Sequence, residues 1–126
     1  MLLLLISLIM QTLTPEQVVQ KQLDTYNARD IEGFMSVMSK DVILVNFMDA
    51  SVIAEGYDQV EKIYKNLFDA SPQLHSSLIN RMVLGHQVID HESITGRLGL
   101  KEAIELIVIY EINDDLKIEK ITILRP

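Results

Sequence analysis

The second half of the chain has the pattern of consecutive β-strands, which constrains the fold more than any other feature. Four segments, residues 74–84, 88–95, 100–112 and 116–124, are rich in strand-forming residues. Short turns containing glycine, asparagine or aspartate separate them. Strands joined by such short turns pair antiparallel, so we expect a four-stranded meander.

The first half of the chain is predicted to contain three helices and one strand. Thr14 and Gln17 have the spacing of a capping box at the start of the first helix, and Asp30 is placed to cap the second. A third helix is expected over residues 57–68, and the apolar run 42–48 is typical of a strand buried on both faces. Helices segregated from an antiparallel sheet indicate an α+β fold.

An apolar segment, residues 1–13, precedes a single predicted domain over residues 14–126. Residues 1–10 are as apolar as a signal-peptide core, but they lack a basic start, since the first lysine is Lys21. Three interpretations stay open: a packing or dimer-contact segment, an export or anchor signal, or a mis-assigned start codon. We expect a cytoplasmic protein, with export as the alternative.

Composition and spacing exclude several classes of function. The net charge of -7 disfavours binding to nucleic-acid phosphates. The chain has no cysteine, and its three histidines do not have the spacing of metal ligands, so no metal site is expected. We expect no cofactor, because there is no glycine-rich phosphate loop.

Several motifs carry a resemblance to a known family. The run YNARDIEGFMSVMSKDV (residues 26–42), Gly56 and Tyr64 of the third helix, and the strand motifs VIDHE (88–92) and IVIYEI (107–112) resemble the nuclear transport factor 2-like superfamily. The most similar branch is SnoaL-like and related to ketosteroid isomerase. The resemblance implies a cone of curved sheet closed by helices, usually dimeric, with a ligand or active site inside. Such domains include both enzymes and binding modules.

The resemblance also places the ketosteroid isomerase residues on this chain. The general-base aspartate would fall at Asn46, the oxyanion-hole tyrosine at Gln22 and the oxyanion-hole acid at Val108. Only the supporting tyrosine is matched, by Tyr64. Steroid isomerisation by that mechanism is therefore not expected.

Strand parity then selects the candidate site. Asp90 and Glu92 share one face of their strand, whereas His91 lies on the other. We predict Glu92 and Asp90 as catalytic acid or base, with the pKa of Glu92 raised by burial. The alignment makes the other cone-facing residues the predicted substrate-binding set: Asn46, Tyr64, Tyr110, Tyr26, Met48 and Val108.

Two alternatives to this site stay open. Glu92 or Asp90 can instead form a structural salt bridge with Arg81 or Arg97. His91 can serve as a base if the sheet has the opposite parity; otherwise it lies on the outer face.

Three functions follow from these observations. The first is a cofactor-free isomerase- or cyclase-type enzyme acting on a small apolar or carbonyl-containing molecule. The second is a module that binds such a molecule without reaction, and the third is a dimerisation domain. A homodimer through the open sheet face is expected, and membrane insertion is not.

Overall fold

A computed structural model describes residues 13–126 of the 126-residue chain. The predictions for residues 1–10 therefore lie outside the described residues.

The described residues form three α-helices, one short 3-10 helix and six strands. In chain order these are α1 (Pro15–Ala28), α2 (Ile31–Met35), β1 (Met38–Asn46), β2 (Val52–Glu55), α3 (Tyr57–Asp69), β3 (His75–Leu84), β4 (Gln87–Thr95), η1 (Arg97–Gly99), β5 (Ile104–Ile112) and β6 (Ile118–Leu124).

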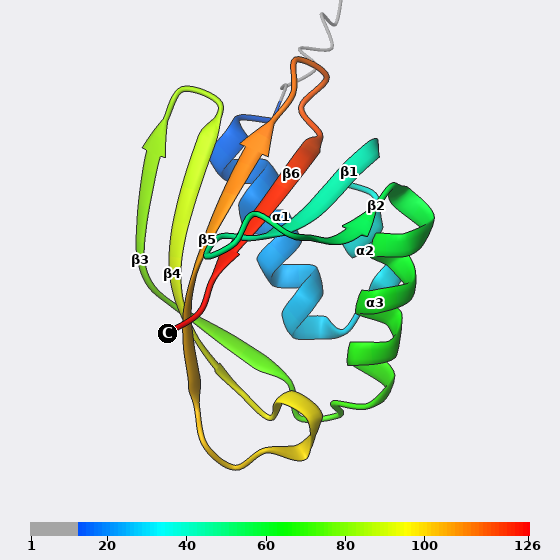
Figure 1. The fold of residues 1–126 in the computed structure, drawn as a ribbon, viewed down its shortest axis with the longest axis vertical. Helices are drawn as coiled ribbons and strands as arrows, with labels where there is room; N and C mark the ends of the chain where they lie inside the picture. Colours follow the sequence, from blue (N-terminus) through cyan, green and yellow to red (C-terminus); the bar gives the residue numbers. More distant parts are fainter. Residues whose placement is uncertain (1–12) are drawn as a thin grey trace, which may run out of the picture.

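All six strands belong to one curved sheet, in the order β2-β1-β6-β5-β4-β3. Strands β3 to β6 are consecutive antiparallel neighbours, which confirms the predicted meander. Strand β1 joins β6 in parallel. The sheet wraps around the three α-helices, which lie on its concave side (Figure 1). The fold is the α+β cone that the sequence predicts.

The helix starts match the predicted caps. Thr14 Oγ1 accepts from the Gln17 backbone N–H at 3.2 Å, and Gln17 Oε1 accepts from the Thr14 N–H at 2.9 Å. Asp30 Oδ1 accepts from the Gly33 N–H at 3.0 Å and so starts α2. Together these bonds satisfy amide groups that have no partner within a helix's first turn.

The end of α1 is attached to the edge strand β3. Asn27 Nδ2 donates to the Ser76 carbonyl at 2.9 Å, and the Ser76 N–H donates to Asn27 Oδ1 at 2.7 Å. This pair of bonds substitutes for a neighbouring strand at that point of the edge. It also fixes where Ser76 sits beneath the helices.

The first strand differs from its prediction. β1 ends at Asn46 rather than Met48, because the chain turns there toward the unpredicted β2. β2 is only four residues long, too short to show a periodicity of its own. Phe47 and Met48 consequently lie in an exposed turn.

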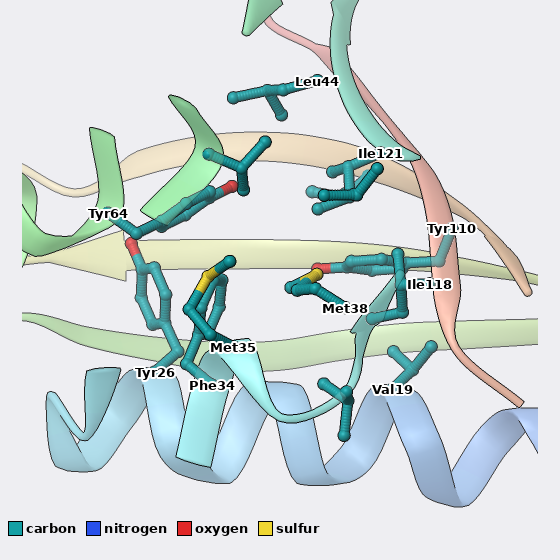
Figure 2. Packing of buried hydrophobic residues seen from close by; sticks show 14 of the residues in the cluster. Val19, Tyr26, Phe34, Met35, Met38, Leu44, Tyr64, Tyr110, Ile118 and Ile121 are labelled. Atoms are coloured by element: carbon teal, nitrogen blue, oxygen red, sulfur yellow. The ribbon is translucent and has the colours of Figure 1, made fainter. Parts of the chain in front are cut away.

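The core lies between the helices and the sheet. Four aromatic rings, those of Tyr26, Phe34, Tyr64 and Phe68, pack against one another, with the Phe34 and Tyr64 centroids 4.5 Å apart. Figure 2 shows Tyr26, Phe34 and Tyr64 gathered between α1 and α3. This cluster holds the helices together.

Candidate functional site

A cavity of about 340 Å³ lies between the helices and the concave face of the sheet. Its size is at the lower end of the range for small-molecule sites. Six of the eight predicted site residues line it: Tyr26, Asn46, Tyr64, Glu92, Val108 and Tyr110. Their roles there stay predictions. The exposed side chains of Ile53 and Arg125 mark where the cavity reaches the surface.

The register of the sheet explains why these residues meet. Glu92 of β4 pairs with Leu106 of β5, and Val108 pairs with Ile123 of β6. All four side chains line the cavity. Successive residues of a strand point to opposite faces. Because the Glu92 side chain points into the cavity, the side chain of its neighbour His91 points to the outer face of the sheet.

Glu92 is the acid of this cavity. Its side chain is buried, with 4 % exposure, and it forms no salt bridge with any residue of 13–126. Burial, and then the negative charge of Asp90, raise the pKa of Glu92 to about 7. The nearby Ser76 hydroxyl and, more weakly, Arg81 act in the opposite direction. A carboxyl group with this pKa exchanges protons readily at neutral pH.

Ser76 lies beside Glu92 on the same wall of the cavity. It pairs with Ile94 on β4, which makes it a diagonal neighbour of Glu92. Its Oγ is buried and has no hydrogen bond of good geometry within residues 13–126. The hydroxyl nevertheless lies close enough to the Glu92 carboxyl group to lower the pKa of that group, so Glu92 is its neighbour in the cavity wall.

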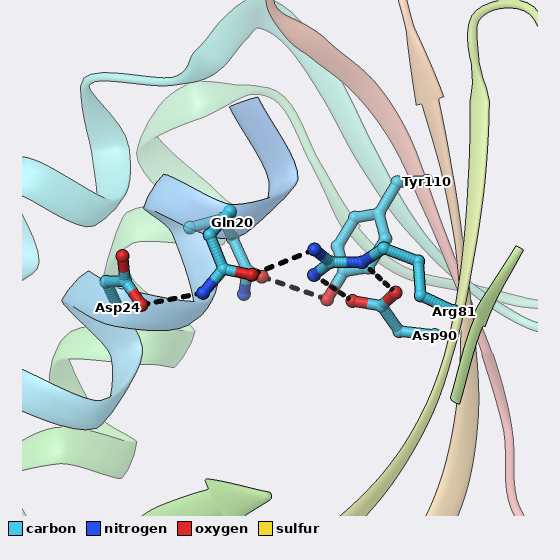
Figure 3. A network of polar contacts seen from close by, with 6 residues as sticks. Gln20, Asp24, Arg81, Asp90 and Tyr110 are labelled. Carbon is cyan, nitrogen blue, oxygen red and sulfur yellow. Dashed lines mark hydrogen bonds and ion pairs between the residues drawn. The ribbon is translucent and has the colours of Figure 1, made fainter. Parts of the chain in front are cut away.

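Asp90, by contrast, is held in a network outside the cavity wall. Arg81 donates from Nε to Asp90 Oδ1 at 2.7 Å and from Nη2 to Oδ2 at 2.9 Å, and from Nη1 to Gln20 Oε1 at 2.8 Å. Gln20 in turn donates to Asp24 at 2.8 Å, as Figure 3 shows.

This network decides between the alternatives left open by the sequence. The structural salt bridge exists, but it is formed by Asp90 and not by Glu92. The prediction that Asp90 shares the cavity with Glu92 is corrected accordingly. Asp90 is fully buried and committed to Arg81, and it acts on Glu92 through its charge.

Three tyrosines supply hydroxyl groups to the cavity. Tyr110 donates to Gln22 Oε1 at 3.1 Å. Burial is the largest cause that raises the pKa of Tyr26, Tyr64 and Tyr110 above the usual value of a phenol. All three therefore keep their protons at neutral pH and serve as hydrogen-bond donors, not as bases.

Met48 and His91 lie outside this cavity. Met48 is 72 % exposed, because β1 ends two residues before it, so its predicted place in the cavity is wrong. Both residues border a shallow hollow of about 450 Å³ on the outer face of the sheet. There His91 Nε2 contacts the carboxylate of Glu105. The outer-face interpretation of His91 is confirmed.

Among the lining residues that sequence reasoning missed are three polar ones, Ser76, Arg97 and Arg125. Arg125 could have been found by extending the strand alternation beyond Ile123. Residues 123 and 125 share a face, so both are expected to point into the cavity. Arg97 lies in a turn, where periodicity gives no direction. Ser76 was hidden by a bulge in β3 between Leu78 and Asn80.

Residues 13–126 contain no group of three His, Cys, Asp or Glu side chains arranged to hold a metal ion. Within the same residues, no helix has the length and apolar character needed to cross a membrane.

Comparison with known proteins places this geometry in a wider group. The sequence model of the SnoaL-like domain matches residues 19–121. A search of the curated proteins finds no match to the sequence.

Solved structures share the fold at low sequence identity. A cystatin-fold protein from Novosphingobium aromaticivorans is 21 % identical, with a TM-score of 0.82 over 90 % of this chain and 100 % of that one. An LEH-like epoxide hydrolase from Mycobacterium tuberculosis is 13 % identical, with a TM-score of 0.76 over 89 % and 82 %. A hypothetical protein from Catenulispora acidiphila with a ketosteroid isomerase-like fold, solved in complex with trimethylamine, is 12 % identical. Its TM-score is 0.72, over 87 % of this chain and 85 % of that one.

Proposed function

The chain belongs to the SnoaL-like domain family, and we propose that it binds a small, mostly apolar, carbonyl-containing molecule in its cavity and moves a proton on it with Glu92. The reaction class is a cofactor-free isomerisation or cyclisation. It begins with removal of a proton from the carbon next to the carbonyl group.

One observation carries this proposal: a buried carboxyl group, unpaired among the described residues, in the wall of a cavity that reaches the surface. With a pKa of about 7, Glu92 is present both as carboxylate and as acid at neutral pH. The carboxylate form takes the proton, and the acid form returns it to another atom of the same molecule.

The rest of the cavity suits the carbonyl group of such a molecule. Proton removal places negative charge on the carbonyl oxygen, which is stabilised by donors already in position. The phenol groups of Tyr26 and Tyr64 are the donors along the wall. The Tyr110 hydroxyl is already directed to Gln22.

Binding without reaction is the second candidate, and a specific observation favours it. The cavity positions that match the isomerase base and oxyanion-hole acid hold Asn46 and Val108, neither of which transfers protons. A pure binding module would use the same cavity and would tolerate loss of the Glu92 carboxyl group.

One experiment separates the two candidates. The protein is incubated in D₂O with a panel of small apolar ketones, and NMR follows both ligand binding and exchange of the hydrogens next to the carbonyl group. An enzyme accelerates exchange, and Glu92→Gln slows it by about 10²- to 10⁴-fold. The matched control Glu119→Gln removes an exposed carboxylate from β6 and leaves exchange unchanged.

The other outcomes have clear meanings. Binding without accelerated exchange supports the binding module. Accelerated exchange that is equal in Glu92→Gln and the unaltered protein contradicts the role proposed for Glu92. Neither binding nor exchange across the panel contradicts the proposed function.

We also propose that two copies associate through the outer face of the sheet. An apolar row crosses this face, formed by Met82 on β3, Ile89 on β4 and Ile109 on β5, which are register neighbours. Ile107 and Leu124 form a second pair beside it. Contiguous apolar surface of this kind marks protein interfaces.

A further inference from the structure

Two arginines without an acidic partner line the cavity. Arg97 comes from the loop between β4 and β5, and Arg125 follows β6. Within residues 13–126, neither guanidinium group forms a salt bridge or a side-chain hydrogen bond. Arg125 is exposed and also borders the outer hollow, whereas Arg97 is half-buried.

The contrast with the other two arginines is informative. Arg29 donates to the Leu74 carbonyl at 3.0 Å, and Arg81 holds Asp90. The chain has 18 acidic residues against 11 lysines and arginines, so partners for a cation are abundant. The two arginines that remain without one nevertheless both face the same cavity.

Arg97 is held in position by the turn that carries it. The Leu98 N–H donates to Ser71 Oγ at 2.8 Å, which attaches η1 to the segment following α3. Gly96, just before η1, has a φ of +72° and lies against the Gln73 carbonyl, so the turn has little room to shift. A positive group placed in advance is favourable for binding an anion.

Both arginines and Glu92 line the same cavity. Arg97 and Arg125 both act on the phenol groups of Tyr26 and Tyr64 and lower their pKa against the effect of burial. The charge of Glu92 acts on the same two phenol groups and raises their pKa. Arg125 is exposed and marks the mouth of the cavity, Arg97 is half-buried, and Glu92 is buried. Apolar side chains, among them Leu67, Leu106 and Ile123, also line the cavity.

We propose that the ligand of this cavity is an apolar monocarboxylate whose carboxylate group is bound at the mouth by Arg97 and Arg125. The planar guanidinium group matches a carboxylate in shape and binds it through two parallel hydrogen bonds. The apolar body lies along the middle of the cavity. The inward end, which carries the carbonyl group, reaches Glu92, and this last step rests on the proposed function.

The cavity volume sets the size of such a ligand. A water molecule occupies roughly 30 Å³ in the liquid. A cavity of about 340 Å³ therefore holds a molecule of roughly ten non-hydrogen atoms, close to an eight-carbon acid.

The test compares three probes of equal chain length: octanoate, octanamide and octyl phosphate. Calorimetric or NMR titration gives the affinity of each at low salt. We expect octanoate to bind most tightly. Arg97→Gln weakens octanoate binding about tenfold, which is about 1.4 kcal/mol, and leaves octanamide binding unchanged. Arg125→Gln has a smaller effect because its side chain is exposed.

Controls make each outcome decisive. Lys65→Gln removes an exposed cation of α3 that lies outside the cavity and leaves all three affinities unchanged. Equal binding of octanoate and octanamide, or no effect of Arg97→Gln, overturns the carboxylate proposal and leaves the proposed function standing. Preference for octyl phosphate overturns the assignment to a carboxylate. No binding of any probe at millimolar concentration contradicts both proposals.

Discussion

Replacing Glu92 with glutamine is predicted to stabilise the protein at neutral pH. Glutamine has the shape of a protonated glutamic acid but cannot ionise. In the folded protein, Glu92 keeps its proton up to a pKa of about 7, whereas in the unfolded chain it loses the proton near 4.5. The substitution therefore removes an ionisation that favours the unfolded chain.

The sign and the size of the effect follow from proton linkage. Between pH 4.5 and about 7 the folded state binds more protons than the unfolded state, so the free energy of unfolding falls as pH rises. The gap between these pKa values, at about 1.4 kcal/mol per pKa unit, corresponds to about 3 kcal/mol. The loss is complete above pH 7, where Glu92 is ionised in both states.

Urea denaturation measures this effect directly. The free energy of unfolding of the unaltered protein and of Glu92→Gln is determined from about pH 4 to pH 8, at one protein concentration. The difference should be nearly constant in acid and should grow by about 3 kcal/mol toward pH 8 in favour of the variant. Glu119→Gln is the matched control, because it removes an exposed carboxylate and should show no such growth.

A flat difference between the two proteins across this range would refute the reasoning. It would mean that Glu92 has the same pKa in the folded and unfolded chain. Subtracting the two curves also cancels the contribution of titrating groups that do not interact with Glu92.

Three further predictions follow. Arg81→Met should cost about 3–5 kcal/mol of unfolding free energy in urea, because it leaves Asp90 buried without its partner, and a loss below about 1 kcal/mol would contradict this. Gly96→Ala should lower the free energy of unfolding in urea more than Gly85→Ala does. Both glycines have positive φ, but only at residue 96 would the new Cβ clash with the Gln73 carbonyl oxygen. Light scattering after size exclusion should give twice the 14.4 kDa of one chain, and a single-chain mass would exclude the proposed dimer.

Part of the candidate site could be predicted from the sequence because strand parity is a local property. Alternation alone separates Glu92 from His91, and the structure places them on opposite faces. The place of Met48 could not be predicted in the same way. Parity holds only while the strand continues, and the end of β1 depends on its pairing with β2.

Ser76 shows how a bulge defeats the same reasoning. Arg81 faces Asp90 on the inner side of the sheet, and strict alternation backward from it would turn Ser77 inward. The register of β3 slips between Leu78 and Asn80, so that Ser76 lines the cavity instead. Nothing in the local sequence of β3 marks that slip.

The sequence by itself determined the α+β class, the caps that begin α1 and α2, and the faces of Glu92 and His91. These depend on periodicity and on neighbours a few residues apart. Only the tertiary structure decided which of the two carboxyl groups forms a salt bridge with Arg81. The hairpin between β3 and β4 aligns Arg81 with Asp90 and leaves Glu92 facing the cavity. That choice depends on the register between strands, which local patterns do not encode.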